Sequence, residues 1–296
     1  MKIYPIHNLI AELSKQLEVC CKPYEAAVQE AWWLLEKLTK TTKPMLFALG
    51  SIQLSDEQQT TLDAWVSQRV VEKKPLQYIL GSVPFCDLEI IVQPPILIPR
   101  PETEEWVTWL IDDLKLVKNN PLKILDLCTG SGCIALALGK AFPQSMVVGI
   151  DINPLSIALA QKNKEHNAIT NVTFLLSDLD RELDPSDRFD LIVSNPPYLT
   201  GQEYDQLEPE VKQWEDQYAL VAPDDGLNFY KRIAQLAPLR LNKSTNFVGY
   251  GLPRVVVEVG SHIEPVKSAF ERCNLRDIRS YRDMQGVMRW VVAYLT

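Results

Sequence analysis

Apolar residues recur every three or four positions through most of the first 80 residues, and this spacing predicts amphipathic helices. One run precedes Pro23, a second follows it, as suits a proline in a first helical turn, and a third begins after Ser55. Ser55 can cap the third helix, and Asp56 and Glu57 favour its N-terminus. We therefore predict a helical-bundle domain over residues 1–80. Its pattern suits a packing module and a platform that grips a macromolecular substrate equally well.

Residues 81–101 have a different character. Residues 85–92 are typical of short β structure, and several prolines follow with almost no glycine or serine, so we predict an ordered β-hairpin and Pro-rich connector rather than a flexible linker. A helix is expected to begin near Thr103. Arg100 stands between two prolines, where its cation can meet a carboxylate; a solvated arginine is the simpler alternative.

From residue 102 to residue 296 the pattern alternates between strand and helix, which predicts an α/β domain with a parallel sheet. Strands are expected over residues 123–127, 146–150, 172–176, 189–194, 255–259 and 290–295. A helix over 134–140 follows the first strand, and Asn153 with Pro154 can cap the helix after the second. Residues 242–253 are polar and are interpreted as a surface insertion before the fifth strand.

The fourth predicted strand runs directly into Asn195-Pro196-Pro197-Tyr198. Two consecutive prolines have no N–H, so the loop presents acceptors: the Asn195 carboxamide oxygen and the neighbouring backbone carbonyls. Tyr198 adds an aromatic wall for a planar group. A planar –NH2 group suits these acceptors, and we predict that the loop is the catalytic and substrate-binding site. The alternative is a rigid turn in which Asn195 and Tyr198 have no chemical role.

Three successive strands carry an aspartate at or near their ends: Asp126, Asp151 and Asp178. Because the carboxyl ends of parallel strands meet at one edge of a sheet, a shared site is favoured over helix capping or solvation. Asp151 can bind the two hydroxyls of a ribose, and Asp178 can accept from an adenine amino group while Leu179 packs on the ring.

The turn after the first strand can bring backbone close to a ligand. This predicted cofactor loop comprises Cys128, Thr129, Gly130, Ser131 and Gly132. A dinucleotide fingerprint would place a glycine three residues after Gly132, where Ala135 stands. The motif therefore fits a nucleoside cofactor without phosphates, and Asn195 is expected to border the same pocket.

Composition narrows the class of partner. The 296 residues are 46% hydrophobic, which supports a substantial core, and their net charge of -8 with a pI near 5.1 argues against tight binding to nucleic-acid phosphates. The six cysteines are scattered without a CxxC pair, so we expect reduced thiols in a cytoplasmic protein and no metal site. No apolar run suits a signal peptide or a membrane span, and no membrane partner is expected.

The sequence resembles the class I S-adenosylmethionine-dependent methyltransferases. More narrowly, it resembles the PrmC/HemK family, the protein-(glutamine-N5) methyltransferases that modify peptide chain release factors. The motifs that carry the resemblance span nearly the whole chain: residues 75–81, Ile98-Pro99-Arg100-Pro101-Glu102-Thr103-Glu104, residues 126–132, Asn195 to Tyr198, Asp225-Gly226-Leu227 followed by Tyr230, and Asp283 with Gly286 and Arg289.

The resemblance implies a Rossmann-like fold with a mostly parallel seven-stranded sheet, S-adenosylmethionine as cofactor, and an N-terminal domain that recognises the substrate. The acceptor would be the glutamine of the Gly-Gly-Gln motif in class-I release factors, whose methylation supports translation termination. We hypothesise that the Asn195 side-chain oxygen and the Pro196 carbonyl each accept one hydrogen from the substrate –NH2, and that Tyr198 packs on the planar amide. Arg100 lies in the junction motif that points to the glutamine family, and it is expected to contribute to substrate binding.

Two rival functions remain. Asn-Pro-Pro-Tyr is shared with nucleic-acid methyltransferases acting on adenine N6 or guanine N2, against which the acidic pI counts. A non-catalytic adaptor is the other, and the intact Gly130, Gly132, Asp151 and Asn195 argue against it.

Four features of the sequence depart from the family pattern. Cys128 stands where glycine is usual. We expect a cysteine to be tolerated there only if the backbone does not need a positive φ. Glu215-Asp216 replaces a common Glu-Pro, the segment before the fifth strand is longer than usual, and a glutamine usual near Gly260 is absent.

Overall fold

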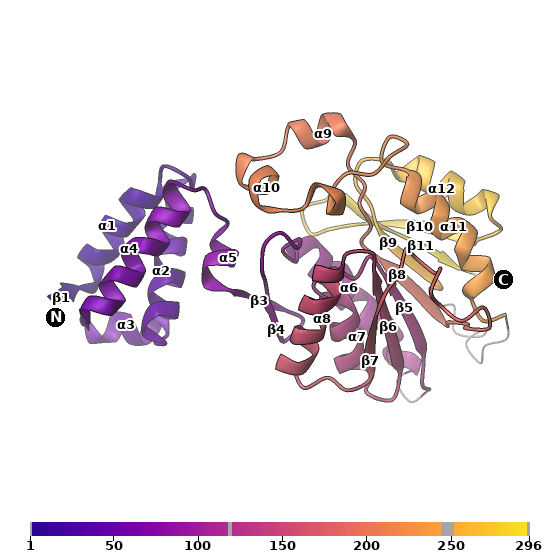
Figure 1. The fold of residues 1–296 in the computed structure, drawn as a ribbon, viewed down its shortest axis with the longest axis horizontal. Helices are drawn as coiled ribbons and strands as arrows, with labels where there is room; N and C mark the ends of the chain where they lie inside the picture. Colours follow the sequence, from indigo (N-terminus) through magenta and orange to yellow (C-terminus); the bar gives the residue numbers. More distant parts are fainter. Residues whose placement is uncertain (1, 118–119, 244–251, 295–296) are drawn as a thin grey trace. The chain divides into compact units, whose positions relative to one another are not determined.

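The structure, a computed structural model, describes residues 2–117, 120–243 and 252–294, and its chain forms two compact units. One unit comprises Met1–Gly81 and Glu208–Trp214, and the other comprises Ser82–Leu207 and Glu215–Thr296 (Figure 1). None of the described helices is both long enough and apolar enough to cross a membrane. The insertion predicted at 242–253 falls largely on residues 244–251, which lie outside the described residues.

The first unit is mainly helical, as predicted. Its helices are α1 (Ile6–Leu17), α2 (Tyr24–Thr39), α3 (Lys43–Leu49), α4 (Asp56–Val70), α5 (Leu76–Leu80) and α10 (Pro209–Trp214). Ser55 caps α4 as expected, because its side chain accepts from the Gln58 N–H while the Gln58 side chain accepts from the Ser55 N–H.

Two short strands in this unit were not predicted. β1 (Lys2–Pro5) pairs antiparallel with β2 (Ser51–Leu54), in which Ile52 and Leu54 alternate with exposed residues. A four-residue strand shows too few alternations to be recognised, and its partner lies far away in the sequence.

The segment 208–214 belongs to the helical unit although it follows the Asn-Pro-Pro-Tyr loop in the chain. Arg69 forms an ion pair with Glu210, and the Trp214 indole N–H donates to the Glu72 carbonyl at 3.1 Å. The Lys74 ammonium lies 5.4 Å from the centre of a Trp214 ring. No sequence pattern indicated this docking, because it joins residues more than 130 positions apart.

The second unit opens with an antiparallel hairpin of β3 (Ser82–Phe85) and β4 (Leu88–Ile91), in agreement with the predicted β structure. The helix expected near Thr103 is α6 (Pro101–Asp113), which begins two residues earlier. Pro101 occupies its first position, where a missing N–H is tolerated and the fixed φ suits the helix. Arg100 is the N-cap residue.

A seven-stranded sheet forms the centre of this unit, in the order β10-β11-β9-β8-β5-β6-β7. The strands are β5 (Lys123–Leu127), β6 (Met146–Asp151), β7 (Val172–Leu176), β8 (Leu191–Ser194), β9 (Val255–Glu258), β10 (Arg276–Arg282) and β11 (Met288–Tyr294). All pairs among β7, β6, β5, β8 and β9 are parallel, and β11 and β10 join antiparallel. β10 was not predicted, because this edge strand is mostly exposed and carries little apolar pattern.

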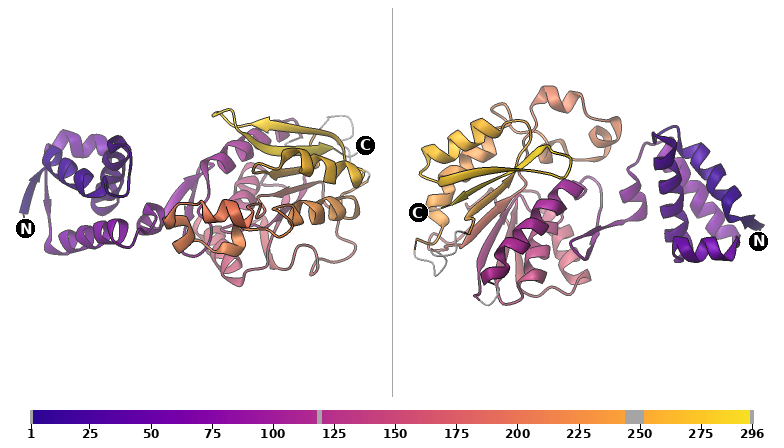
Figure 2. Two further views of the ribbon diagram at one scale, coloured as in Figure 1. Left: turned by 90° about the horizontal axis from the view of Figure 1, so that it is seen from above. Right: turned by 180° about the vertical axis from the view of Figure 1, so that it is seen from behind.

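Helices cover both faces of the sheet (Figures 1 and 2). α6, α7 (Cys133–Ala141) and α8 (Pro154–His166) lie on one face, and α11 (Asn228–Arg240) and α12 (Ile263–Arg272) lie on the other. Successive residues of a strand pack on opposite faces of the sheet. Val193 packs in the hydrophobic core beneath α6 and α7, and Ile192 packs in the core beneath α11 and α12. The remaining elements are η1 (Leu114–Val117), α9 (Gly201–Asp205) and η2 (Gln217–Ala219). This layering leaves the carboxyl ends of the parallel strands as the edge at which a ligand can bind.

Candidate active site

The Asn195 to Tyr198 loop leaves β8 at the centre of the sheet and is fixed at both ends. Before it, the Ser194 hydroxyl donates to the Leu127 carbonyl at 2.7 Å, which ties β8 to β5. After it, the Tyr198 and Leu199 N–H groups donate to the Leu220 carbonyl at 3.2 and 2.9 Å. The predicted rigid loop is therefore held by bonds outside the two prolines.

A cavity of about 260 Å³ lies at the carboxyl ends of the strands. The predicted site residues that line it are Cys128, Gly130, Asp151, Asp178, Leu179, Asn195 and Pro197. Other lining residues were not foreseen, among them Ile152, Asn153, Asp216, Phe229 and Arg232. Most of these lie outside the short motifs, so only the folded chain brings them to the cavity.

Four predicted cofactor residues do not line this cavity: Asp126, Thr129, Ser131 and Gly132. Asp126 is fully buried, accepts from the Thr129 hydroxyl at 2.5 Å, and has its pKa raised to about 7 by burial. Gly132 has φ +82°, and a Cβ there would lie 2.8 Å from the Phe174 ring. These residues shape the turn beneath the cavity.

Asp151 is held in one orientation at the end of β6. Its Oδ2 accepts from the Gly130 N–H at 2.8 Å and its Oδ1 from the Asn153 N–H at 2.9 Å. Burial raises the pKa of this carboxyl, and the backbone N–H bonds oppose that rise. Each carboxylate oxygen retains capacity to accept from a hydroxyl, so the fixed carboxylate can bind a diol.

Asp178 is paired with a cation that also lines the cavity. Its Oδ1 accepts from Arg232 at 2.7 Å, and Arg181 lies 3.3 Å from its Oδ2. The next residue, Leu179, has φ +53° and is buried. Arg232 was not predicted as a site residue, because it lies on α11 with no local motif to mark it.

The backbone conformation of Cys128 differs from the one expected. Its φ is +60°, so the requirement for a negative φ at this position was wrong. The next residue is tied down, because the Thr129 N–H donates to the Ile150 carbonyl at 2.9 Å. Burial and the neighbouring carboxylates raise the pKa of the Cys128 thiol, so it lines the cavity as a neutral group.

A second, smaller cavity of about 50 Å³ adjoins the first. The two share Leu97, Asn195, Pro197 and Ala219, and the smaller one is also lined by residues that include Arg100, Pro196, Tyr198 and Glu258. Burial raises the pKa of the Tyr198 phenol, which is therefore neutral. The Asn195 side chain thus stands where the two cavities meet.

Arg100 meets a carboxylate, and the simpler alternative of a solvated arginine was wrong. Its Nη2 lies 2.5 Å from Glu215 Oε2, and the Glu215 side chain is only 1% exposed. The neighbouring Asp216 explains one departure from the family pattern, because its N–H donates to the Pro95 carbonyl at 2.8 Å. A proline at that position could not make this bond.

A buried chain of polar groups reaches Asn195 from α6. The Asn195 Nδ2 lies 3.2 Å from the Thr103 hydroxyl, which lies 2.6 Å from Glu258 Oε2. The Trp106 indole N–H donates to the same carboxylate oxygen at 2.9 Å. No role was predicted for Thr103, Trp106 or Glu258, although Thr103 stands in the junction motif.

The C-terminal motif is connected to the same junction. Arg289 donates to Asp283 at 2.8 Å, and its guanidinium lies 3.9 Å from Glu102. The Asp283 carboxylate also accepts from the Val287 and Gln285 N–H groups. This turn between β10 and β11 thereby orients Arg289 toward the start of α6.

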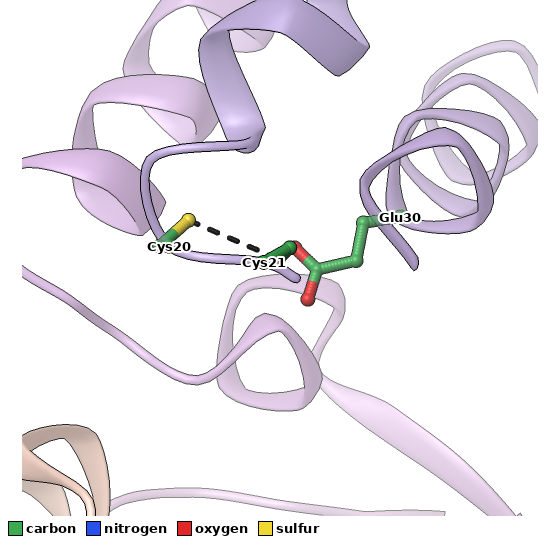
Figure 3. A group of neighbouring side chains, drawn as sticks. All are labelled: Cys20, Cys21 and Glu30. Carbon is green, nitrogen blue, oxygen red and sulfur yellow. Dashed lines mark hydrogen bonds between the residues drawn. The ribbon is translucent and has the colours of Figure 1, made fainter. Parts of the chain in front are cut away.

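One group of side chains in the described residues has metal-ligand spacing. Cys20, Cys21 and Glu30 have ligand atoms within 4.8 Å of one another in the helical unit (Figure 3). Arg69 already binds both Glu30 oxygens, at 2.9 and 3.0 Å, and lies 3.5 Å from the Cys21 sulfur. A metal ion bound here would have to displace this guanidinium.

Comparison with known proteins decides the family. Residues 8–81 match the family model of the PrmC N-terminal domain, and residues 108–211 match that of the methyltransferase small domain. The release factor glutamine methyltransferase of Geobacter sulfurreducens is 36% identical over 271 residues, covering 91% of this chain and 90% of the relative. This chain belongs to the release factor glutamine methyltransferase family.

Two further relatives bear the same family name. That of Thermodesulfovibrio yellowstonii is 38% identical over 235 residues, covering 78% of this chain and 83% of the relative. That of Escherichia coli (strain K12) is 34% identical over 263 residues, covering 88% of this chain and 89% of the relative. Membership of the release factor glutamine methyltransferase family, predicted from the motifs, is confirmed.

A solved structure confirms the predicted fold of this family member. The hMettl16 catalytic domain, in complex with MAT2A 3'UTR hairpin 6, matches with a TM-score of 0.53 at 18% identity, covering 81% of this chain and 82% of that chain. The likeness shows the predicted class I S-adenosylmethionine-dependent methyltransferase fold, with its mostly parallel seven-stranded sheet.

Proposed function

We propose that this protein transfers a methyl group from S-adenosylmethionine to the side-chain amide nitrogen (N5) of the glutamine in the Gly-Gly-Gln motif of class-I peptide chain release factors. This activity supports translation termination and implies a cytoplasmic protein. The observation that carries the proposal is the meeting of a larger and a smaller cavity at Asn195 and Pro197. A methyl donor in the larger cavity and a planar amide in the smaller one would face each other across the Asn-Pro-Pro-Tyr loop.

The larger cavity has the chemistry that a nucleoside cofactor requires. Asp151 offers fixed acceptor oxygens to ribose hydroxyls, and Leu179 and Phe229 offer apolar surface to a base. Arg232, the only arginine or lysine among the described lining residues, is paired with Asp178. The cavity therefore suits a cofactor without phosphates.

Asp178 has a defined part in this arrangement. Its Oδ1 accepts from Arg232, and the carboxylate can still accept a hydrogen bond from an exocyclic adenine amino group through its remaining lone pairs.

Gly130 has φ +55°, and a Cβ at this residue would meet no atom within 4 Å. Backbone geometry, rather than crowding, favours glycine here.

The smaller cavity would bind and orient the acceptor amide. When bound, S-adenosylmethionine supplies an electrophilic methyl group on a sulfonium. The Asn195 Oδ1 and the Pro196 carbonyl each accept one hydrogen of the glutamine –NH2, which turns the nitrogen lone pair toward the larger cavity. Because positive charge develops on that nitrogen, these acceptors bind the transition state more strongly than the ground state.

Two neighbouring groups support the same step. Tyr198 packs on the planar amide with a neutral phenol, and the buried Glu258 carboxylate also lines the small cavity. The N–C bond would form as the sulfonium S–CH3 bond breaks and leaves a neutral thioether, and the nitrogen would then release one proton to solvent. No side chain has to deprotonate the amide beforehand.

The choice of substrate follows the relatives named above. Their printed name specifies a release factor glutamine. A nucleic-acid amine would present a similar –NH2, but the net charge of -8 opposes binding to phosphates. The likeness to an RNA-bound methyltransferase domain concerns the fold only, since the identity is 18%.

The test is a transfer assay with methyl-labelled S-adenosylmethionine. Purified protein is incubated separately with a class-I release factor, the same factor with its Gly-Gly-Gln glutamine replaced by alanine, DNA and RNA. We expect label only in the unmodified release factor. Label in DNA or RNA alone would establish the rival function, and no label in any substrate would support an adaptor.

A further inference from the structure

We propose that Thr103 is a positioning residue, which with Glu258 orients the Asn195 carboxamide so that its oxygen faces the acceptor amide. This inference rests on the proposed function for its consequence in catalysis, and on the hydrogen-bond geometry for the orientation itself. Nothing in the family name or the motif pattern assigns Thr103 this part.

With no proton on Glu258 Oε2, the donors and acceptors of the buried chain permit one arrangement of hydrogen bonds. The Trp106 indole nitrogen can only donate, so Glu258 Oε2 accepts its hydrogen at 2.9 Å. Thr103 has a single hydroxyl hydrogen, and at 2.6 Å from the same carboxylate oxygen that hydrogen points to Glu258. The Thr103 oxygen is then available only as an acceptor on its remaining side.

Asn195 must therefore present its –NH2 group to Thr103. The two side chains approach to 3.2 Å, and the only hydrogen between them is on Asn195 Nδ2. A flipped carboxamide would place two acceptor oxygens against each other and lose the bond. The orientation thus follows from the donors available, independently of how the amide atoms are labelled.

Burial makes this orientation firm. Thr103 and Glu258 are each 2% exposed and Trp106 is fully buried, so water has little access to compete for these bonds. Thr103 and Trp106 are three residues apart on α6 and share one face of the helix, which faces the end of β9 where Glu258 stands. Burial raises the pKa of Glu258, and a proton on its other oxygen would leave Oε2 able to accept both bonds.

The consequence is a carboxamide oxygen directed away from Thr103. Asn195 lines both cavities, so the freed Oδ1 is available to the substrate –NH2 at their junction. Without the Thr103 hydroxyl the carboxamide could rotate and present its –NH2 to the substrate, where two donors would oppose each other. Loss of Thr103 should therefore slow the methyl transfer while leaving cofactor binding intact.

The kinetic test compares Thr103→Val, Thr103→Ser and Thr108→Val. Thr103→Val keeps the shape and removes the hydroxyl, and we expect kcat for release factor methylation to fall about 10- to 100-fold, with cofactor affinity within about threefold of wild type. Thr103→Ser should restore kcat to within about threefold. Thr108→Val, an exposed change on the same helix, is the matched control and should match wild type. Thr103→Val at wild-type kcat would overturn the positioning role.

A second measurement does not depend on activity. In nitrogen-15 NMR spectra of the whole protein, the Asn195 side-chain –NH2 signals are identified by their loss in Asn195→Asp. We expect one of these hydrogens to be protected from exchange in wild type and Thr103→Ser, and unprotected in Thr103→Val. Equal protection in all three would overturn the inference. If wild type fails to methylate the release factor but shows this pattern, the proposed function fails and the orientation stands.

Discussion

The backbone carbonyl oxygen of Tyr198 lies against Gly226, so closely that a Cβ at residue 226 would be 2.3 Å from that oxygen. Gly226 also has φ +82°. The Asp-Gly-Leu motif therefore supports the Asn-Pro-Pro-Tyr loop by letting a second backbone segment approach it without a side chain.

Gly226→Ala should displace the loop and lower kcat at least about tenfold, because a shift of about 1 Å at reacting groups can cost a hundredfold. Gly286→Ala is the matched control. Gly286 has φ +81° with nothing within 4 Å of its Cβ position, so this variant carries the backbone strain of about 1 kcal/mol without the clash. Urea unfolding and kcat are measured for both. Equal effects would show that contact with Tyr198 is unimportant.

Asn195→Ala should reduce kcat about a hundredfold, since removing one preorganised hydrogen-bonding group from a transition-state site has an effect of this size. The affinity for S-adenosylmethionine should stay within about threefold, because the larger cavity has many other lining residues. Steady-state kinetics and calorimetry give the two quantities. Equal losses in both would contradict the role of Asn195 in binding the acceptor amide.

Asp151→Ala should weaken S-adenosylmethionine binding about 10- to 100-fold, because hydrogen bonds to a charged group contribute about 1.5–3 kcal/mol. The change also releases the Gly130 and Asn153 N–H groups that the carboxylate holds. Calorimetric titration measures the affinity. Asp112→Ala, at an exposed position outside the cavity, is the control and should bind as wild type does. Unchanged affinity in Asp151→Ala would remove this residue from the cofactor site.

At position 128 glycine should give a more stable protein than alanine, which reverses their usual order of stability. At a negative φ, alanine is more stable than glycine by about 0.4–1 kcal/mol, whereas at the observed φ of +60° alanine is strained. Both variants lose the same thiol, so comparing them isolates the backbone. We expect Cys128→Gly to have the larger free energy of unfolding in urea titration. A more stable Cys128→Ala would contradict the left-handed backbone at this turn.

Asp126 should make stability depend on pH. Its pKa is raised from the ordinary value of about 3.9 to about 7, chiefly by burial, so between these values the folded protein keeps a proton that the unfolded chain releases. The free energy of unfolding should therefore fall as pH rises through this window and level off above about 7. In Asp126→Asn this contribution is absent.

The measurement is urea unfolding of wild type and Asp126→Asn from about pH 5 to about pH 8. The advantage of wild type over the variant should shrink as pH rises to about 7 and stay constant above that value. A difference that stays constant would show that Asp126 is ionised throughout the range.

Local pattern was sufficient for the elements that carry a clear apolar pattern. β5 and β7 have the predicted bounds, and α2 and α4 follow the expected helical periodicity, because each contains enough apolar positions to show its period. β10 has too little apolar pattern, and β1 and β2 are too short. These strands form only because a neighbouring strand pairs with them.

The candidate site shows the same division between residues. The Asn195 to Tyr198 loop, the Gly130 turn and Asp151 were found from the sequence because each lies directly after a recognisable strand. Arg232, Asp216 and Glu258 reach the two cavities from elements that no motif joins to them. Glu215 could not be assigned as the partner of Arg100, since 115 positions separate them.

The sequence by itself determined most of the strands and helices, the methyltransferase motifs and the loop of acceptors, because these depend on side chains close together in the chain. Only the tertiary structure decided which loop residues line the cavity, that Cys128 takes a positive φ, and that Thr103 lies between Asn195 and Glu258. The reason is physical: hydrogen bonds between distant residues and a turn held by its neighbours are properties of packing, which no local pattern records.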